Sequence, residues 1–401
     1  MNRETLEKIQ KAIREEGLDG WLFCNFRHRD ALADELLERP ASLTNSRLWL
    51  YAVPASGGPL AIVHAIEADH LDGLPAGETF GYVSRAELLE RLAGLAGKRW
   101  GVHSSENISA VSYMDAGVAA MLTRAGLILA GAEGLIQRFK SLLDRGQIES
   151  HERAAVGLYE IVEAVWDFVR AAHAEGRRLY EGDLRQIMED GLKRRALFRD
   201  HAPQAAAGKN SANPHYDFSG QGCPVEAGDV IQLDLWAREA GGVYADISWA
   251  GYYGKEPPEA LETVFAAAAE ARESALAFIG GRLAGNIPVT GAEVDRHTRG
   301  VLIKSGYGNA IKHRTGHGID TEVHGSGVNM DGVEFPDTRR LLEGSCFSLE
   351  PGIYLAGHGF RTEIDVYIRE GRAVVSGGGH KAQCPQTGRA IEGRQFTLLH
   401  C

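Results

Sequence analysis

The chain has 401 residues, of which 44% are hydrophobic and 24% charged, a balance typical of a globular protein long enough for two domains. Its formal net charge of −11, without any block rich in lysine and arginine, argues against a nucleic-acid-binding protein. No apolar run is long enough to cross a membrane, and the N-terminal segment is a charged amphipathic helix rather than a signal peptide. We therefore expect a cytoplasmic protein with no membrane partner.

The cysteine pattern favours the same compartment. The cysteines are scattered along the chain and form no CxxC pair: Cys24, Cys223, Cys346, Cys384 and Cys401. An odd and scattered set argues against a disulfide framework and against a thiolate zinc site. A reducing environment is the simplest expectation.

Residues 1–131 alternate helical and extended patterns, which predicts an N-terminal α/β domain, with a mixed sheet. The expected strands are 20–24, 47–51, 60–64, 99–102 and 126–129, and the expected helices are 6–13 and 111–122. This part contains no glycine-rich phosphate loop and no group of histidines and acids with ligand spacing. We interpret it as a scaffold or a lid.

Residues 132–147 are expected to form a connecting helix that breaks near Asp144, followed by a catalytic domain over 148–401. The apolar periodicity of this second half predicts long helices at 150–174, 180–195, 257–279 and 291–305. Strands punctuated by glycine and proline lie between and after these helices.

Two apolar strand patterns in the second half each contain one aspartate. Asp234 lies within 230–236 and Asp246 within 243–249, and glycines between the two patterns suit a hairpin turn. If the two aspartates pair directly, the turn is centred at Ala240, beside Gly241. The pattern then predicts two carboxylates that face each other on neighbouring strands.

A second hairpin is expected over 346–368, CFSLEPGIYLAGHGFRTEIDVYI, where Glu350 and Glu363 stand among apolar residues. Strand interiors disfavour glutamate, and a carboxylate buried without a partner costs several kcal/mol. Direct pairing of the two glutamates centres the turn between Ala356 and Gly357, with Cβ atoms about 4.5–5.5 Å apart. That separation suits carboxylates that share metal ions; the alternative is an exposed face with solvated charges.

Four histidines complete the set of unusual polar residues. His313, His317 and His324 lie in one segment, and the glycines that flank His317 suit a close approach of backbone and imidazole to a ligand. His215 follows Asn-Pro in a predicted turn. Taken singly, each of these histidines is more often structural than functional.

Taken together, four carboxylates and one imidazole make an oxygen-rich site for two divalent ions. Ligation dominated by carboxylates favours Mn²⁺, with Co²⁺, Zn²⁺ or Fe²⁺ as alternatives. Two ions about 3.5–4 Å apart can share a bridging water, lower its pKa and stabilise a tetrahedral intermediate. The chemistry that this arrangement supports is hydrolysis.

The residues that carry this argument resemble a known family. The order of the candidate ligands and the motifs PHY, HRTGHG, LEPGIY and RTE resemble those of the M24 metallopeptidases. This family includes methionine aminopeptidase, aminopeptidase P and prolidase. The resemblance covers 148–375 and implies an α+β pita-bread catalytic domain. The α/β domain expected before it resembles the aminopeptidase P, prolidase and creatinase branch.

The resemblance also implies roles for the metal ligands. By position, Asp234 would chelate one ion, Asp246 and Glu363 would bridge both, and His317 and Glu350 would complete the coordination of the other. Glu350 also resembles the general base, which takes a proton from the bridging water and passes it to the leaving nitrogen.

Further residues resemble the catalytic and substrate-contacting groups of the family. His324 resembles the histidine that stabilises the tetrahedral intermediate, and His215 and His313 resemble histidines that contact the substrate. Arg361 resembles an arginine that supports the site; the alternative is a salt bridge without catalytic effect, and Asp365 is a candidate partner for it. The implied catalytic set is Glu350, His324, His215 and Arg361.

This likeness favours a homodimeric Xaa-Pro dipeptidase that acts on small peptides through a hydroxide bridging two ions. The alternatives are an aminopeptidase P that acts on longer peptides, an ectoine hydrolase-like or lyase-like relative, and a binding module. Creatinase-like chemistry is disfavoured because that branch has lost metal ligands that this chain keeps. The chain departs from the usual family motifs at Asp320, Gly325 and Ile364. These departures concern the substrate pocket, so the resemblance specifies the substrate least.

Overall fold

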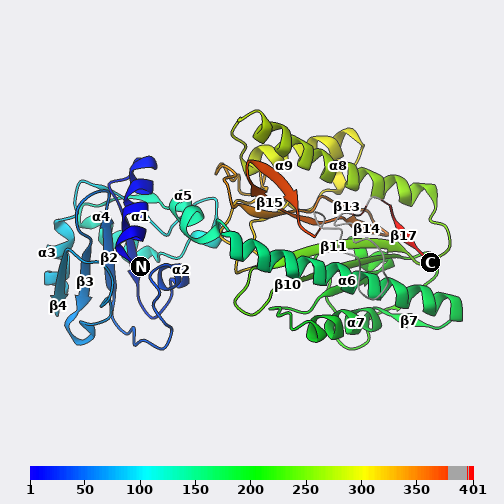
Figure 1. The fold of residues 1–401 in the computed structure, drawn as a ribbon, viewed down its shortest axis with the longest axis horizontal. Helices are drawn as coiled ribbons and strands as arrows, with labels where there is room; N and C mark the ends of the chain where they lie inside the picture. The colour runs from blue at the N-terminus through cyan, green and yellow to red at the C-terminus, as the bar shows by residue number, and fades with distance from the viewer. Residues whose placement is uncertain (378–394, 396) are drawn as a thin grey trace. The chain divides into compact units, whose positions relative to one another are not determined.

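The computed structural model describes residues 1–377, 395 and 397–401, and in it the chain forms two units, Met1–Lys140 and Ser141–Cys401 (Figure 1). In the described ranges, Cys24, Cys223, Cys346 and Cys401 are free thiols, whereas Cys384 lies outside these ranges. Among the helices of the described part, none combines the length and the apolar character that a bilayer-crossing segment needs.

A mixed six-stranded sheet forms the centre of the first unit, in the order β4-β3-β2-β1-β5-β6. Both faces of the sheet are buried, because Trp21 and Phe23 of β1 pack with α1 whereas Leu22 packs with α3 and α4 on the other face. The predicted mixed α/β architecture is confirmed. The elements are α1 Arg3–Glu15, β1 Gly20–Asn25, α2 Ala31–Leu36, β2 Trp49–Pro54, β3 Leu60–His64, β4 Glu78–Tyr82, α3 Arg85–Ala93, β5 Arg99–Val102, α4 Ala116–Arg124, β6 Ile128–Gly131 and α5 Glu133–Ile136.

Two predictions in this unit differ from the structure. Strand β4 was not expected, because its residues are mostly exposed and lack an apolar alternation. The helix expected over 111–122 begins only at Ala116, because the side chain of Asp115 caps it by accepting a hydrogen bond from the amide of Val118 (2.9 Å).

Helical backbone covers 133–141 of the helix expected over 132–143. Helix α5 is short and runs into a π-helical turn, Gln137–Ser141. The long helix α6, Arg145–Glu175, begins five residues before the predicted start at Ser150. Asp144 and Gln147 form a capping box, with each side chain accepting from the other residue's backbone amide, and this fixes the earlier start.

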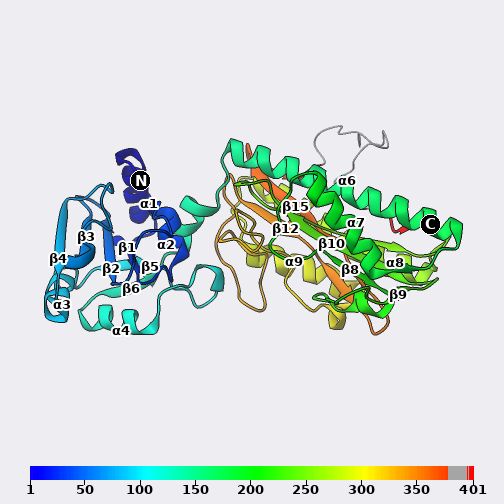
Figure 2. The same ribbon diagram turned by 90° about the horizontal axis from the view of Figure 1, so that it is seen from below.

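The second unit contains the long helices α6, α7, α8 and α9 and several short sheets. Strands β17-β11-β10-β8 form one sheet and β12-β15-β16 another, while β13-β14 and β7-β9 are two-stranded. Figures 1 and 2 show α6 running along the sheet that contains β10 and β11. The remaining bounds are β7 Leu179–Tyr180, α7 Glu181–Arg194, β8 Gln204–Ala207, β9 Pro224–Val225, β10 Val230–Ala237, β11 Ala245–Tyr252, α8 Glu259–Ala284, α9 Gly291–Lys304, β12 Cys346–Leu349, β13 Gly352–Tyr354, β14 Gly359–Arg361, β15 Ile364–Arg369, β16 Arg372–Val375 and β17 Leu399–His400.

The predicted register of the 346–368 hairpin is confirmed. Leu349 pairs with Ile364 and Gly352 with Arg361, so Glu350 and Glu363 stand opposite each other between the two ladders. The turn closes where the sequence indicates, with the amide of Leu355 donating to the carbonyl of His358 (2.9 Å).

The predicted register of β10 and β11 is wrong by two residues along β11. Asp234 pairs with Ser248, and Asp246 pairs with Trp236, so the two aspartates are diagonal neighbours. The connection 238–244 is centred on Gly241, whose φ of +70° lies in the left-handed region that favours glycine, and not on Ala240.

Candidate metal centre and active site

Strand alternation in β10 and β11 directs two aspartates away from the helix-covered face. Leu233, Leu235 and Ile247 pack in the core beneath α6. Because successive strand residues point to opposite faces, Asp234 and Asp246 face away from α6 and toward β15. Both carboxylates are nevertheless buried, with 7% and 5% of their residue surface exposed.

A tight backbone approach holds His317 beside these strands. The amide of His317 donates to Ser348 Oγ (3.0 Å), and its carbonyl accepts from the amide of Ser348 (2.9 Å). A β-carbon at Gly316 would lie 2.0 Å from the carbonyl oxygen of Ser348, so this contact requires glycine. The glycine before His317 therefore has a packing reason.

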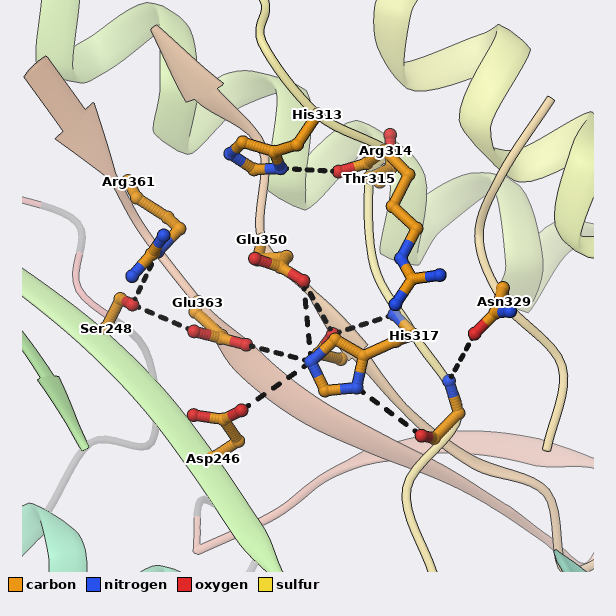
Figure 3. Close-up of polar contacts among 12 residues, drawn as sticks. Asp246, Ser248, His313, Arg314, Thr315, His317, Asn329, Glu350, Arg361 and Glu363 are labelled. Carbon is orange, nitrogen blue, oxygen red and sulfur yellow. Dashed lines mark hydrogen bonds and ion pairs between the residues drawn. The ribbon is translucent and has the colours of Figure 1, made fainter. Parts of the chain in front are cut away.

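His317 lies at the centre of a cluster of carboxylates (Figure 3). Its Nε2 atom is 3.6 Å from Asp246 Oδ2, 3.5 Å from Glu350 Oε1 and 4.0 Å from Glu363 Oε1. One ligand atom each from Asp246, His317 and Glu363 lies within 4.8 Å of the others. The structure thus brings three of the predicted ligands around the imidazole of a fourth, His317.

The cluster fits a divalent cation. Asp246 Oδ1 and Glu363 Oε1 are buried and have no hydrogen-bond partner among the described residues. Burial, together with repulsion from the neighbouring carboxylates, raises the pKa of both groups well above the usual range. A cation between them would remove this cost, and carboxylate and imidazole donors are ligands that first-row divalent ions accept.

Asp234, the fifth predicted ligand, is held by two neighbours. Arg361 Nη2 forms an ion pair with Asp234 Oδ2, and Ser248 Oγ lies 2.7 Å from Asp234 Oδ1. The same hydroxyl lies 2.8 Å from Glu363 Oε2 and accepts from Arg361 Nε (2.9 Å). Each carboxylate oxygen has a second lone pair, so these bonds leave Asp234 able to bind an ion.

Glu350 and His317 have different protonation behaviour. Burial opposes ionisation of Glu350, but the nearby His317, His313 and Arg361 outweigh it and lower the pKa of Glu350 to about 2. Burial lowers the pKa of His317 to about 4. At neutral pH the structure therefore holds a charged Glu350 beside a neutral imidazole, and the neutral form is the one that binds metal.

A cavity of about 490 Å³ opens onto the cluster. His215 and His324 line it together with Arg361, and the ring of His324 lies 4.4 Å from that of His317. Its lining residues are Asp200, His201, Ala202, Gln204, His215, Asp217, Asp234, Trp236, Asp246, His317, Val323, His324, Glu350, Arg361 and Glu363.

His313 is not among the lining residues. Its Nδ1 bonds with the carbonyl of Arg314 (2.7 Å) and its Nε2 with the hydroxyl of Tyr354 (2.7 Å), so both ring nitrogens have partners within the protein. The candidate pair of Arg361 with Asp365 is wrong. Asp365 Oδ2 accepts from the amide of Asp246 (2.8 Å), and Arg361 pairs with Asp234.

Sequence reasoning missed Ser248, which contacts Asp234 and Glu363, and several residues that line the cavity. Ser248 could have been found, because it follows Asp246 by two positions and so shares its strand face, and Trp236 follows Asp234 in the same way. Asp200, His201 and Asp217 lie outside the strands, and no periodic pattern indicates them.

The model of metallopeptidase family M24 matches residues 149–370. The chain belongs to this family. The predicted family is therefore confirmed, and so is the predicted fold class, an α/β unit followed by the pita-bread fold of M24 metallopeptidases.

Curated relatives and solved structures that are similar to this chain have dipeptidase names. The chain is similar to an Xaa-Pro dipeptidase of Lactobacillus delbrueckii subsp. lactis, with 35% identity over 38% of this chain and 37% of the relative. It is also similar to the probable dipeptidase PepE of Mycobacterium bovis, with 24% identity over 82% and 84%. The crystal structure of dipeptidase PepE from Mycobacterium ulcerans superposes with a TM-score of 0.72 at 20% identity, over 99% of this chain and 97% of that one. The chain spans less than half the length of the Xaa-Pro peptidases that it matches above 30% identity.

Proposed function

We propose that this M24 member is a dinuclear metal-dependent Xaa-Pro dipeptidase. The observation that carries the proposal is the set of unpartnered buried carboxylate oxygens of Asp246 and Glu363 beside His317, at the cavity of about 490 Å³. A cavity of this size is in the range of small-molecule sites, and polar groups converge on one part of it. The name of the Lactobacillus relative supports the choice of an Xaa-Pro substrate.

Five residues would hold two ions: Asp234, Asp246, His317, Glu350 and Glu363. When bound, the ions supply Lewis-acid polarisation of the scissile carbonyl and lower the pKa of water. We propose Mn²⁺, because four of the five donors are carboxylates.

The protein groups around the ions would move protons and orient the substrate. Glu350 is charged at neutral pH, and its Oε1 faces the centre of the cluster, so it is suited to accept a proton from the attacking water and pass it to the leaving nitrogen. His324 lines the cavity beside His317 and would contact the tetrahedral intermediate. Arg361 fixes Asp234 through an ion pair and Ser248 through a hydrogen bond.

A dipeptidase must also hold the free carboxylate of its substrate. Arg361 is largely committed to Asp234, and Arg314 is not among the cavity-lining residues. His215 is exposed and lines the cavity, so it is the better candidate for this contact. His313, with both nitrogens engaged, would act through Tyr354 and not by direct contact.

One assay separates this function from its alternatives. The purified protein is analysed for bound metal and then supplied with Mn²⁺ and three substrate classes: Xaa-Pro dipeptides, Xaa-Pro-Yaa tripeptides and non-peptide amides. We expect cleavage of the dipeptides with the highest kcat/KM. Faster cleavage of the tripeptides would indicate an aminopeptidase P, and a metal-loaded protein that cleaves no Xaa-Pro bond would rule out the proposal.

The cytoplasmic location and the homodimer remain expectations. The first follows from the composition and the second from the family resemblance. Native mass spectrometry of the purified protein tests the dimer directly.

The loop that carries His324 depends on Asp320. This buried carboxylate accepts hydrogen bonds from the amides of Glu322 and Ser326 (both 2.9 Å), and the amide of Gly325 donates to the carbonyl of Gly318 (2.8 Å). We expect Asp320→Ala to lower kcat/KM by about 10–100-fold, the usual cost of removing a group that orients a functional residue. Steady-state kinetics of the metal-loaded variant measures the loss.

A double-mutant cycle distinguishes positioning of His324 from a general loss of stability. In a His324→Ala background, Asp320→Ala should add little further loss. The control is Asp331→Ala, which removes another buried carboxylate that holds a loop, through the amides of Val333 and Glu334 (both 3.0 Å), away from the cavity. Additive losses for Asp320 and His324 would contradict the positioning role.

A further inference from the structure

The cavity contains a carboxylate that neither the metal cluster nor the proposed proton transfers use. Asp200 lies between α7 and β8 and lines the cavity. Backbone hydrogen bonds between Phe198 and Arg238 in both directions (2.8 and 2.9 Å) fix the segment before it against the end of β10. Asp200 is therefore a fixed feature of the lining, held by main-chain contacts on its N-terminal side.

Trp236 holds the side chain of Asp200 beside the metal cluster. The indole Nε1 of Trp236 donates to Asp200 Oδ1 at 2.6 Å. Trp236 in turn pairs across the sheet with Asp246, one of the ligand residues. The carboxylate of Asp200 thus lines the same cavity as the ligand residues without being part of the ligand group.

The charge of Asp200 is weakly compensated. Partial burial opposes its ionisation, but the hydrogen bonds from Trp236 and His201 outweigh burial and lower the pKa of Asp200. Among the described residues its ion-pair partner is His201 Nδ1 at 3.1 Å, and that imidazole is 80% exposed. No arginine or lysine of the described ranges forms an ion pair with it.

The other carboxylates of the cavity differ in this respect. Asp217 is paired with Arg185 at 2.8 Å, and Asp234 is paired with Arg361. The three remaining acids of the lining surround His317, where the metal ions would neutralise them. Asp200 is therefore the lining carboxylate whose charge is left for the substrate.

We propose that Asp200 makes this enzyme selective for Xaa-Pro substrates whose first residue carries a positively charged side chain. This inference rests on the proposed function and specifies its substrate class. A cationic side chain that reaches Asp200 gains a charge pair next to a partly buried indole, whereas an acidic side chain meets like charge. Neutral side chains fall between the two.

Three dipeptides that differ in charge test the proposal. The dipeptides are Lys-Pro, Gln-Pro and Glu-Pro, because Gln and Glu have the same shape and differ in charge. They are compared at pH 8, where an ordinary imidazole is largely neutral. We expect kcat/KM to fall in the order Lys, Gln, Glu for the metal-loaded wild type. Asp200→Asn keeps the shape of the side chain and removes its charge. In this variant the ratio of kcat/KM for Lys-Pro to kcat/KM for Glu-Pro should shrink by about tenfold.

The matched control is Asp217→Asn, in which the lost carboxylate was already paired with Arg185. We expect the Lys-to-Glu ratio of this variant to stay within about twofold of wild type, as for a compensated surface pair. If Asp200→Asn slows all three dipeptides equally, the selectivity proposal is overturned, and Asp200 contacts the α-ammonium that every substrate shares.

Binding measurements keep this test separate from the proposed activity. Calorimetric titration of the metal-loaded Glu350→Gln variant with each dipeptide gives dissociation constants without turnover. Tighter binding of Lys-Pro than of Glu-Pro that Asp200→Asn abolishes supports the inference, even if no Xaa-Pro bond is cleaved. In that case only the proposed function fails. Equal Kd values for the three dipeptides overturn the inference.

Discussion

Asp246→Ala should remove both metal binding and activity while leaving the fold intact. The side chain supplies one member of the Asp246–His317–Glu363 group, and its loss leaves too few donors to hold the cluster of ions. We expect kcat/KM to fall by about 10³-fold or more, because the Lewis-acid role of the metal supplies several kcal/mol of transition-state stabilisation. Bound metal is measured by elemental analysis and activity by dipeptide cleavage.

Stability measurements sharpen this prediction. In the metal-free protein, Asp246 is a buried carboxylate whose charge is opposed by its surroundings, so its removal should not lower Tm at neutral pH. Added Mn²⁺ should raise the Tm of wild type, because a ligand that binds only the folded state stabilises it, and should leave Asp246→Ala unchanged. A variant that keeps full activity would show that the metal assignment is wrong.

A matched aspartate controls for nonspecific effects. Asp229 is a partly buried aspartate of the second unit that accepts a hydrogen bond from the amide of Glu226 (2.9 Å), but it does not line the cavity. Asp229→Ala should lose some stability and keep both metal and activity.

Arg361→Ala should cause the largest loss of stability among the predicted variants. Arg361 is 6% exposed, and its guanidinium contacts Asp234, Ser248 and the carbonyl of Pro214. Removing it leaves the carboxylate of Asp234 buried without a cation, beside the acids around His317. We expect the free energy of unfolding to fall by about 3–5 kcal/mol, the usual cost of breaking a buried ion pair from one side. Urea denaturation of the metal-free protein measures this loss.

An exposed arginine provides the comparison. Arg153 forms two hydrogen bonds to Glu239 (2.9 and 2.8 Å), yet its side chain is 59% exposed. Arg153→Ala should cost less than about 1 kcal/mol, because solvent screens such pairs. Arg361→Lys should recover part of the loss, since it restores the charge but not the simultaneous contacts with Ser248 and Asp234. Equal losses for Arg153→Ala and Arg361→Ala would contradict the buried-pair interpretation.

The ligand residues were predictable because each breaks a strong local rule. Asp234, Asp246, Glu350 and Glu363 are acids inside apolar strand patterns, and burial of such groups is costly unless a partner is present. His317 was marked by its flanking glycines, and the contact of Gly316 with Ser348 gives the physical reason for the first of them. Each of these signals lies within a few residues of the ligand that it marks, so it needs no tertiary information.

The amino-acid sequence by itself determined the candidate ligand group, the family and the register of the 346–368 hairpin, because spacing and turn glycines act locally. Tertiary structure alone decided which side chains face the cavity. It turned His313 toward Tyr354, paired Arg361 with Asp234 instead of Asp365, and brought Asp200 to Trp236. Each of these contacts joins segments far apart in the chain, and their pairing depends on how strands and loops pack together, which no local pattern encodes.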